Sequence, residues 1–546
     1  MKKADKIYLG NVITMDDKKP SAEAVAVKDG QIMYVGSESM ARSLSDSSTE
    51  IIDLKGNTIY PGFMEAHCHP IGAGKLLDKV TYCDLSAGET MDDYLKILTD
   101  FVAKYPDREH YDATGFVECG VKPLASMLDE ICADRPVIVM TSDGHSLWLN
   151  TKAMEKYGIN KESAKVYGPD TCRVLEDGTP TGYISENPAF DVRAQIKTSI
   201  EDGVNALLAA QDFFFSMGYT AIYDAGIELV EKTAADIYAA TVATGKYKLR
   251  TYSGSVIDEF CEDIEGAVDN IAKMQEKYNS EYFKVIGVKT FTDGVVEGHT
   301  ALLLDDYNDK PGYKGVARMA DHDKLTRMYT SAALRGMNVH VHTIGDGAIR
   351  CNLDAIEEAA ANTGLMDCRF ALAHLQIVNK DDIARFGDLN VVAVVAPLWT
   401  PKYPEIFLSV EQETAYVGAE RLENEYPIKS FIDAGAAIAF HTDYPVSQNV
   451  NIPNSIHTAV LRRDPGTTPD CAREADEFIT RLQAVEALTK NVAYMWHEED
   501  RLGTLEIGKI ANMSVYDSDF LHDDLEKVGN SKLVCTIVDG DIVYKS

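Results

Sequence analysis

The sequence is poor in the features that mark secreted and membrane-spanning proteins. It holds 10 cysteines in 546 residues and no CxxC pair, which is typical of reduced thiols rather than of a disulfide framework. No run of about 18 apolar residues occurs, and residues 1–20 lack the apolar core of a signal peptide. We therefore expect a cytoplasmic protein without a membrane partner.

Basic residues are also scarce. The chain has 53 lysines and arginines against 86 aspartates and glutamates, a formal net charge of −33. This charge repels phosphate backbones and anionic lipid surfaces. We expect no nucleic-acid partner.

What is present is an ordinary globular composition with β-prone segments at both ends of the chain. Hydrophobic residues make up 45% of the sequence and charged residues 25%, and 546 residues exceed one small core. The terminal segments carry the hairpin-turn dipeptides Asp29-Gly30 and Asp539-Gly540. Because neither end has enough strands alone, we predict one small β-sandwich built from residues 1–61 and 500–546.

The central segment, residues 62–499, alternates β-branched runs with stretches of helical spacing. Such alternation predicts an α/β fold of the (β/α)8 TIM-barrel type, whose chemistry lies at the C-terminal ends of the strands. The gap at about residues 75–215 is too long for an ordinary connection, so we predict an inserted subdomain over the barrel mouth. The eight expected strands lie in TIYPGFMEAHCHP, YTAIYDAG, YKLRTYSG, YFKVIGVKTFTDG, MNVHVHTIGDG, RFALAHLQ, NVVAVVAPLW and AAIAFHTDYP.

Several of these strands end in residues that could bind a metal ion. An HxH pair alone fits a metal site or a protein core about equally well, but buried charge is costly unless it is paired or metal-bound. Polar groups at the same level of several strands therefore favour a metal site. The strand-end residues are His67 and His69 on the first strand, Lys289 on the fourth, His340 and His342 on the fifth, His374 on the sixth, and His441 and Asp443 on the eighth.

The motifs that hold these residues resemble those of the amidohydrolase superfamily, in its amidohydrolase-3 branch of N-substituted formamide deformylase-like hydrolases. PGFMEAHCHP resembles the PGxxDxHxH motif of this family, and DGHSLWLN resembles DGHxxWxN. VKTFTDG, VHTIGDGA, ALAHLQ and HTDYPV follow in the family's order, and GTLEIGKIANMSVYD resembles its closing hairpin. The resemblance spans nearly the whole chain.

The resemblance implies a metal centre. His67 and His69 would bind one divalent ion with Asp443, and His342 and His374 would bind a second. Lys289 would bridge the two as a carbamate, which is anionic where an ammonium would repel the cations. Without this modification one ion is expected, and Lys289 would instead form a buried pair with Asp293. Zinc suits the ligands, and manganese, iron or cobalt would also fit.

The same resemblance gives roles to other side chains. Asp443 is the expected general base, with pure ligation as its alternative. His145 would hydrogen-bond the substrate carbonyl or merely stabilise its loop. Trp399 is expected to form pocket wall or core, and Asp293 to contact substrate or support the site.

Two residues near the expected metal site depart from the family pattern. Glu65 stands where aspartate is usual, and His441 occupies a position that is usually small. The first could alter support of the metal site, and the second could narrow the pocket or compete for metal.

We therefore expect a metal-dependent amidohydrolase that cleaves a non-peptide C–N bond, of amide or N-formyl type, in a small molecule. The alternatives are an esterase, lactonase or cyclic imidase with the same metals, or a non-catalytic small-molecule-binding protein on the same scaffold. By resemblance, the chain would form a homo-oligomer, a dimer.

Overall fold

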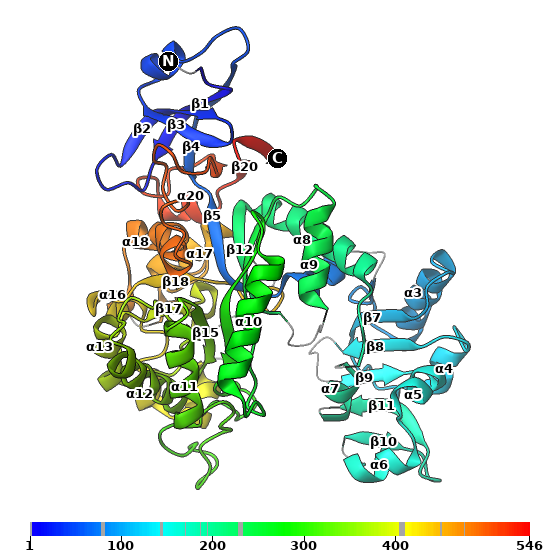
Figure 1. Cartoon of the computed structure of the whole chain (residues 1–546). Coiled ribbons are helices and arrows are strands. Elements are labelled where there is room, and N and C mark those ends of the chain that lie inside the picture. Colours follow the sequence, from blue (N-terminus) through cyan, green and yellow to red (C-terminus); the bar gives the residue numbers. More distant parts are fainter. Residues whose placement is uncertain are drawn as a thin grey trace. The chain divides into compact units, whose positions relative to one another are not determined.

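The computed structural model describes ten stretches of the chain, coloured along the sequence in Figure 1. Its residues divide into two compact units. One unit comprises Met1–His69, Gln211–Ile227 and Val242–Ser546, and the other comprises Pro70–Ala210 and Glu228–Thr241. The described stretches are residues 3–77, 82–141, 146–169, 171–185, 187–193, 195–227, 233–402, 410–447, 450–473 and 475–546.

The first unit contains an eight-stranded sheet whose neighbouring strands are all parallel and follow chain order. This confirms the predicted TIM-barrel fold class. Its strands are fully or largely buried, as expected for a parallel sheet that is covered on both faces. They are β5 (Phe63–Cys68), β12 (Tyr219–Ile227), β13 (Arg250–Val256), β14 (Phe283–Phe291), β15 (Asn338–Thr343), β16 (Ala371–His374), β17 (Val392–Val395) and β18 (Ile438–Phe440).

Helices connect successive strands on the outer side of the barrel (Figure 1). Several begin at an Asp or Asn side chain that accepts a hydrogen bond from the first turn, and α12 ends at Gly364 in the left-handed region. The connecting helices include α10 (Ile264–Tyr278), α11 (His322–Ala333), α12 (Asp346–Thr363), α13 (Lys380–Asp388) and α16 (Ile428–Asp433).

The barrel closes between β18 and β5, the two ends of the hydrogen-bonded strand order. The Asp443 backbone N–H donates to the His67 carbonyl (3.0 Å), and the His69 N–H donates to the Tyr444 carbonyl (2.8 Å). The buried Glu65 carboxylate adds hydrogen bonds from the Thr442 N–H (3.0 Å) and hydroxyl (2.9 Å). Closure therefore joins the segments that carry three predicted metal ligands.

A seven-stranded sheet in the same unit joins the two ends of the chain, and the β-sandwich expected there stays a prediction. Its middle strand, β4, pairs parallel with β1 from the N-terminal segment and antiparallel with β19 from the C-terminal segment. Asp29-Gly30 and Asp539-Gly540 have the positive φ angles that tight hairpin turns need. In order, the strands are β21 (Asp541–Lys545), β20 (Leu533–Val538), β19 (Met513–Tyr516), β4 (Glu50–Pro61), β1 (Lys6–Ile13), β2 (Ser21–Lys28) and β3 (Gln31–Gly36).

The second unit has its own six-stranded sheet and its own buried clusters. It overlaps the insertion predicted at about residues 75–215, and its placement over the barrel mouth stays a prediction. The strands are β10 (Cys172–Val174), β11 (Pro180–Ser185), β9 (Ser146–Leu149), β8 (Val137–Thr141), β7 (Tyr111–Phe116) and β6 (Tyr82–Asp84). The helices beside them include α3 (Met91–Lys104), α4 (Ala125–Asp129), α5 (Thr151–Tyr157) and α6 (Lys161–Tyr167).

Among the described residues, none of the helices has the length and apolar character needed to cross a membrane.

Candidate metal centre

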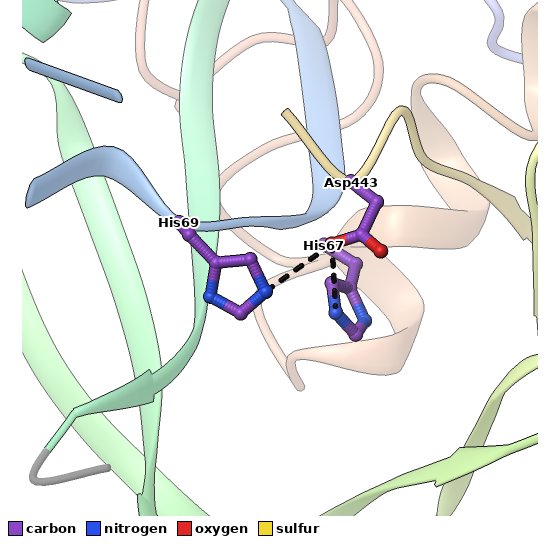
Figure 2. Close-up of side chains that lie close together, drawn as sticks. All are labelled: His67, His69 and Asp443. Carbon is purple, nitrogen blue, oxygen red and sulfur yellow. Dashed lines mark ion pairs between the residues drawn. The ribbon is translucent and has the colours of Figure 1, made fainter. Parts of the chain in front are cut away.

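His67, His69 and Asp443 meet where β5 and β18 end. Their ligand atoms lie within 4.8 Å of one another. The Asp443 carboxylate lies 3.4 Å from His67 Nε2 and 3.2 Å from His69 Nε2, and Figure 2 shows it facing both imidazoles. Among the described histidines, cysteines and acids, this is the group of three that could hold a metal ion.

Local backbone irregularities aim these side chains. The pairing of β5 with β12 shifts register between Glu65 and Cys68, just where His67 stands. Asp443 has a φ of 56° and His374 a φ of 82°, values that residues with a side chain rarely adopt. Such strain at strand ends is typical of functional sites.

The predicted second set, Lys289, His342 and His374, lies on the adjacent strands β14, β15 and β16. Phe291 pairs with His342, and Thr343 pairs with His374. The His342 and His374 ring centroids are 4.6 Å apart, and His67 and His374 are 4.8 Å apart. The structure therefore brings both predicted sets into one cluster.

Lys289 is fully buried, and its amine has no hydrogen-bond partner among the described residues. Its alternative partner, Asp293, accepts instead from the backbone N–H groups of Leu302 (2.9 Å), Ile344 (3.0 Å) and Gly345 (2.8 Å). The structure therefore does not contain the Lys289–Asp293 pair.

Burial lowers the pKa of Lys289 to about 7, although the charges of Asp443 and Asp224 oppose this shift. Burial alone would raise the pKa of Asp443, but the hydrogen bond from His69 and nearby positive charge lower it. Near neutral pH, Lys289 therefore has a substantial fraction of neutral amine, and Asp443 is a carboxylate.

Burial also keeps three of the predicted histidine ligands, His67, His342 and His374, neutral. It lowers the pKa of His342 to about 4 and holds those of His67 and His374 well below the usual value, with positive neighbours adding to the effect. Neutral imidazoles are the form that binds metal ions.

The residues fit a divalent cation because the buried polar atoms without hydrogen-bond partners gather here. A buried polar atom normally has a partner, since leaving it without one is costly. Imidazole nitrogens and a carboxylate oxygen suit zinc and similar ions. The atoms in this part of the described structure are Lys289 Nζ, His340 Nδ1, both ring nitrogens of His374 and both ring nitrogens of His441, and they lie beside the Asp443 carboxylate, which faces His67 and His69.

The structure differs in what it shows of the three residues that were expected to contact substrate, His145, Trp399 and Asp293. His145 lies outside the described residues. Trp399, in the short helix η1 (Pro397–Trp399), stacks on His374 at 5.4 Å and donates its Nε1–H to Ser447 Oγ (2.8 Å). It is thus a wall of the cluster. Both carboxylate oxygens of Asp293 accept hydrogen bonds from backbone N–H groups, and its contact with substrate stays a prediction.

The contacts of two supporting side chains, His340 and Glu65, were not predicted from the sequence. His340 Nε2 and His67 Nδ1 lie 2.9 Å apart, so His340 orients a predicted ligand. Glu65 accepts from the His67 N–H (3.0 Å) as well as from Thr442. The departure from the family's aspartate was the available signal for Glu65, and no signal pairs His340 with His67 across the barrel.

A buried charged network beside the residues that follow β16 was also not predicted from the sequence. Gln376, two residues after His374, donates to Glu413 (2.8 Å) and Glu425 (3.0 Å). Arg473 pairs with both of these glutamates. These residues come from distant segments, so spacing could not have joined them.

The chain belongs to the amidohydrolase family, whose family model matches residues 50–544. This membership confirms the resemblance seen in the motifs, and it supports hydrolase activity with a divalent metal cofactor.

Individual relatives match along the full chain at modest identity. The chain is 28% identical to Protein LONG AFTER FAR-RED 3 of Arabidopsis thaliana, over 98% of this chain and 90% of that one. It is 25% identical to N-substituted formamide deformylase of Arthrobacter pascens, over 99% and 98%. An uncharacterized metal-dependent hydrolase from Pyrococcus horikoshii OT3 has the same fold, with a TM-score of 0.76, 21% identity and coverage of 95% and 99%.

Proposed function

We propose that the protein is a metal-dependent hydrolase that cleaves a non-peptide C–N bond, of amide or N-formyl type, in a small molecule. The observation that carries the proposal is a buried cluster at the C-terminal strand ends of an amidohydrolase-family barrel. It joins imidazole and amine atoms that have no hydrogen-bond partner among the described residues to the Asp443 carboxylate. The relative named N-substituted formamide deformylase supports the choice of bond.

In this proposal, His67, His69 and Asp443 hold one divalent ion, and His342 and His374 hold a second. Lys289 bridges them when it is carboxylated, and one ion is bound otherwise. Zinc is the ion that the imidazole set favours. Divalent ions held there would polarise the carbonyl of the substrate and make a water molecule acidic near neutral pH.

The chain's own groups then move the protons. The Asp443 carboxylate, ionised at neutral pH, accepts a proton from the attacking water and passes it to the departing nitrogen. The Trp399 ring, stacked on His374 at 5.4 Å, presents an apolar wall that excludes bulk water from this face. His145 is the proposed donor to the substrate carbonyl.

The test is a substrate panel with purified, metal-loaded protein. N-formyl compounds and acyl amides are compared with esters, lactones and cyclic imides, each with and without a chelator. We expect chelator-sensitive hydrolysis of the amide group, lost in His69→Ala and Asp443→Asn and retained in His522→Ala, an exposed histidine outside the cluster.

Full activity in both site variants would remove the assignment. Hydrolysis confined to esters, lactones or imides would keep the metal site and change the bond. Tight small-molecule binding without any turnover would indicate a binding protein.

A further inference from the structure

His441 is a buried histidine in the centre that the ligand assignment leaves without a role. It follows β18, two residues before Asp443, and is 1% exposed. Neither of its ring nitrogens has a hydrogen-bond partner among the described residues. A buried imidazole normally uses at least one nitrogen, so this ring can take a partner outside the described residues, such as a metal ion.

The ring lies at a ligand-like distance from two predicted metal ligands. Its centroid is 5.2 Å from that of His67 and 5.0 Å from that of His374, and these two centroids are 4.8 Å apart. Two imidazoles on one tetrahedral ion, with metal–nitrogen bonds of about 2.0–2.1 Å, place their centroids about 5 Å apart. The His441 ring therefore lies at the distance from His67, and at the distance from His374, that two imidazoles on a shared ion require.

The surroundings hold His441 in this position. Its backbone N–H donates to the Val395 carbonyl (3.0 Å), which ties it to the neighbouring strand β17. Trp399 lies edge-on at 5.2 Å and closes one side of the ring. Aromatic packing of this kind fixes the ring centroid but offers no acceptor for its nitrogens.

Rotation of the His441 imidazole about its own Cβ–Cγ bond can point a ring nitrogen toward a shared ion. In the present arrangement, His441 does not join the group of His67, His69 and Asp443, whose ligand atoms lie within 4.8 Å. Rotation about the Cβ–Cγ bond swings the nitrogens while the centroid stays close to that axis. This terminal torsion is broad in energy, so the turn is permitted.

We propose that His441 is an additional metal ligand, which joins one of the two ions that the proposed function assigns to His67 and to His374. The proposal rests on the proposed function only in requiring a divalent ion in this cluster. It adds a ligand on the eighth strand beyond Asp443.

The test uses Co²⁺ as the probe, because its visible absorption reports the number and kind of ligands. Metal-free wild type and His441→Leu are titrated with Co²⁺, and affinities are measured by chelator competition. We expect a changed visible spectrum and at least a tenfold weaker affinity for the variant. His457→Leu is the matched control, because it removes an equally buried histidine whose nitrogens lie near Arg463 O (3.2 Å) and Glu526 (3.4 Å).

Circular dichroism checks that each variant folds, and His441→Asn replaces His441→Leu if the latter does not. A spectrum and affinity equal to those of wild type would overturn the inference. Unchanged Co²⁺ binding with a raised KM would also overturn it, and would assign the ring to substrate. Wild type that takes up no Co²⁺ would overturn the metal-dependent function as well, so the two failures are distinguishable.

Discussion

Replacing Glu65 tests how the barrel closes around the metal centre. Its Oε1 accepts from the backbone N–H groups of His67 and Thr442, and its Oε2 accepts from the Thr442 hydroxyl. Glu65→Leu leaves all three buried donors without an acceptor. Glu65→Gln keeps one oxygen for the two N–H groups, and its amide can donate to the hydroxyl, which rotates to accept.

The expected change in the free energy of unfolding follows from the three donors that lose their acceptor. Each buried donor left unsatisfied costs about 1–3 kcal/mol, and these costs are not fully additive. The burial of a leucine side chain offsets part of the loss, at about 1.5–3 kcal/mol. We expect Glu65→Leu to lower the free energy of unfolding by about 2–5 kcal/mol, and Glu65→Gln to change it by about 1 kcal/mol or less.

The assay is urea unfolding of the metal-free proteins, followed by circular dichroism at pH 7. A second readout is divalent-ion affinity. It should fall in Glu65→Leu because the three hydrogen bonds to Glu65 hold β5 beside the segment with Asp443. Equal stability of the leucine and glutamine variants would refute the reasoning, since it would mean that the three hydrogen bonds contribute nothing.

Three further predictions follow from buried charges. Burial raises the pKa of Glu65 from 4.5 to about 8, so the folded chain binds the carboxyl proton more tightly than the unfolded chain does. As pH rises from 4.5 to about 8, metal-free wild type should therefore lose up to about 5 kcal/mol of unfolding free energy relative to Glu65→Gln. Urea unfolding at several pH values measures this loss. Added bicarbonate should increase metal uptake by chelator-treated wild type but not by Lys289→Ala, measured by elemental analysis, and no bicarbonate effect would argue against a carbamate. Arg473→Met should lower the free energy of unfolding by about 3–5 kcal/mol, because Glu413 and Glu425 lose their buried cation. An unfolding temperature equal to that of wild type by calorimetry would show that this network does not stabilise the fold.

The barrel and the ends of its strands could be predicted from the sequence because both depend on periodicity. β-branched runs alternate with helical spacing, and the polar residues stand where each run stops. This was sufficient to place His67, Lys289, His374 and Asp443 at one end of one sheet.

The contacts that tune the site could not be predicted in this way. His340 and His67 lie on strands that are far apart in sequence, and only the curvature of the closed sheet brings their nitrogens to 2.9 Å. The register shift beside His67 and the positive φ of His374 are local irregularities, which alternation of apolar and polar residues does not encode. Glu65 was recognised as unusual, but its bonds to Thr442 depend on how the barrel closes.

The most direct test of the account is the metal content of the purified protein, measured by elemental analysis beside His69→Ala and His522→Ala. We predict one or two divalent ions per chain in wild type and in His522→Ala, and a clear loss in His69→Ala. A wild-type protein without divalent ions after growth and purification with added zinc, or a His69→Ala variant with unchanged content, would contradict the assignment of this cluster as a metal centre.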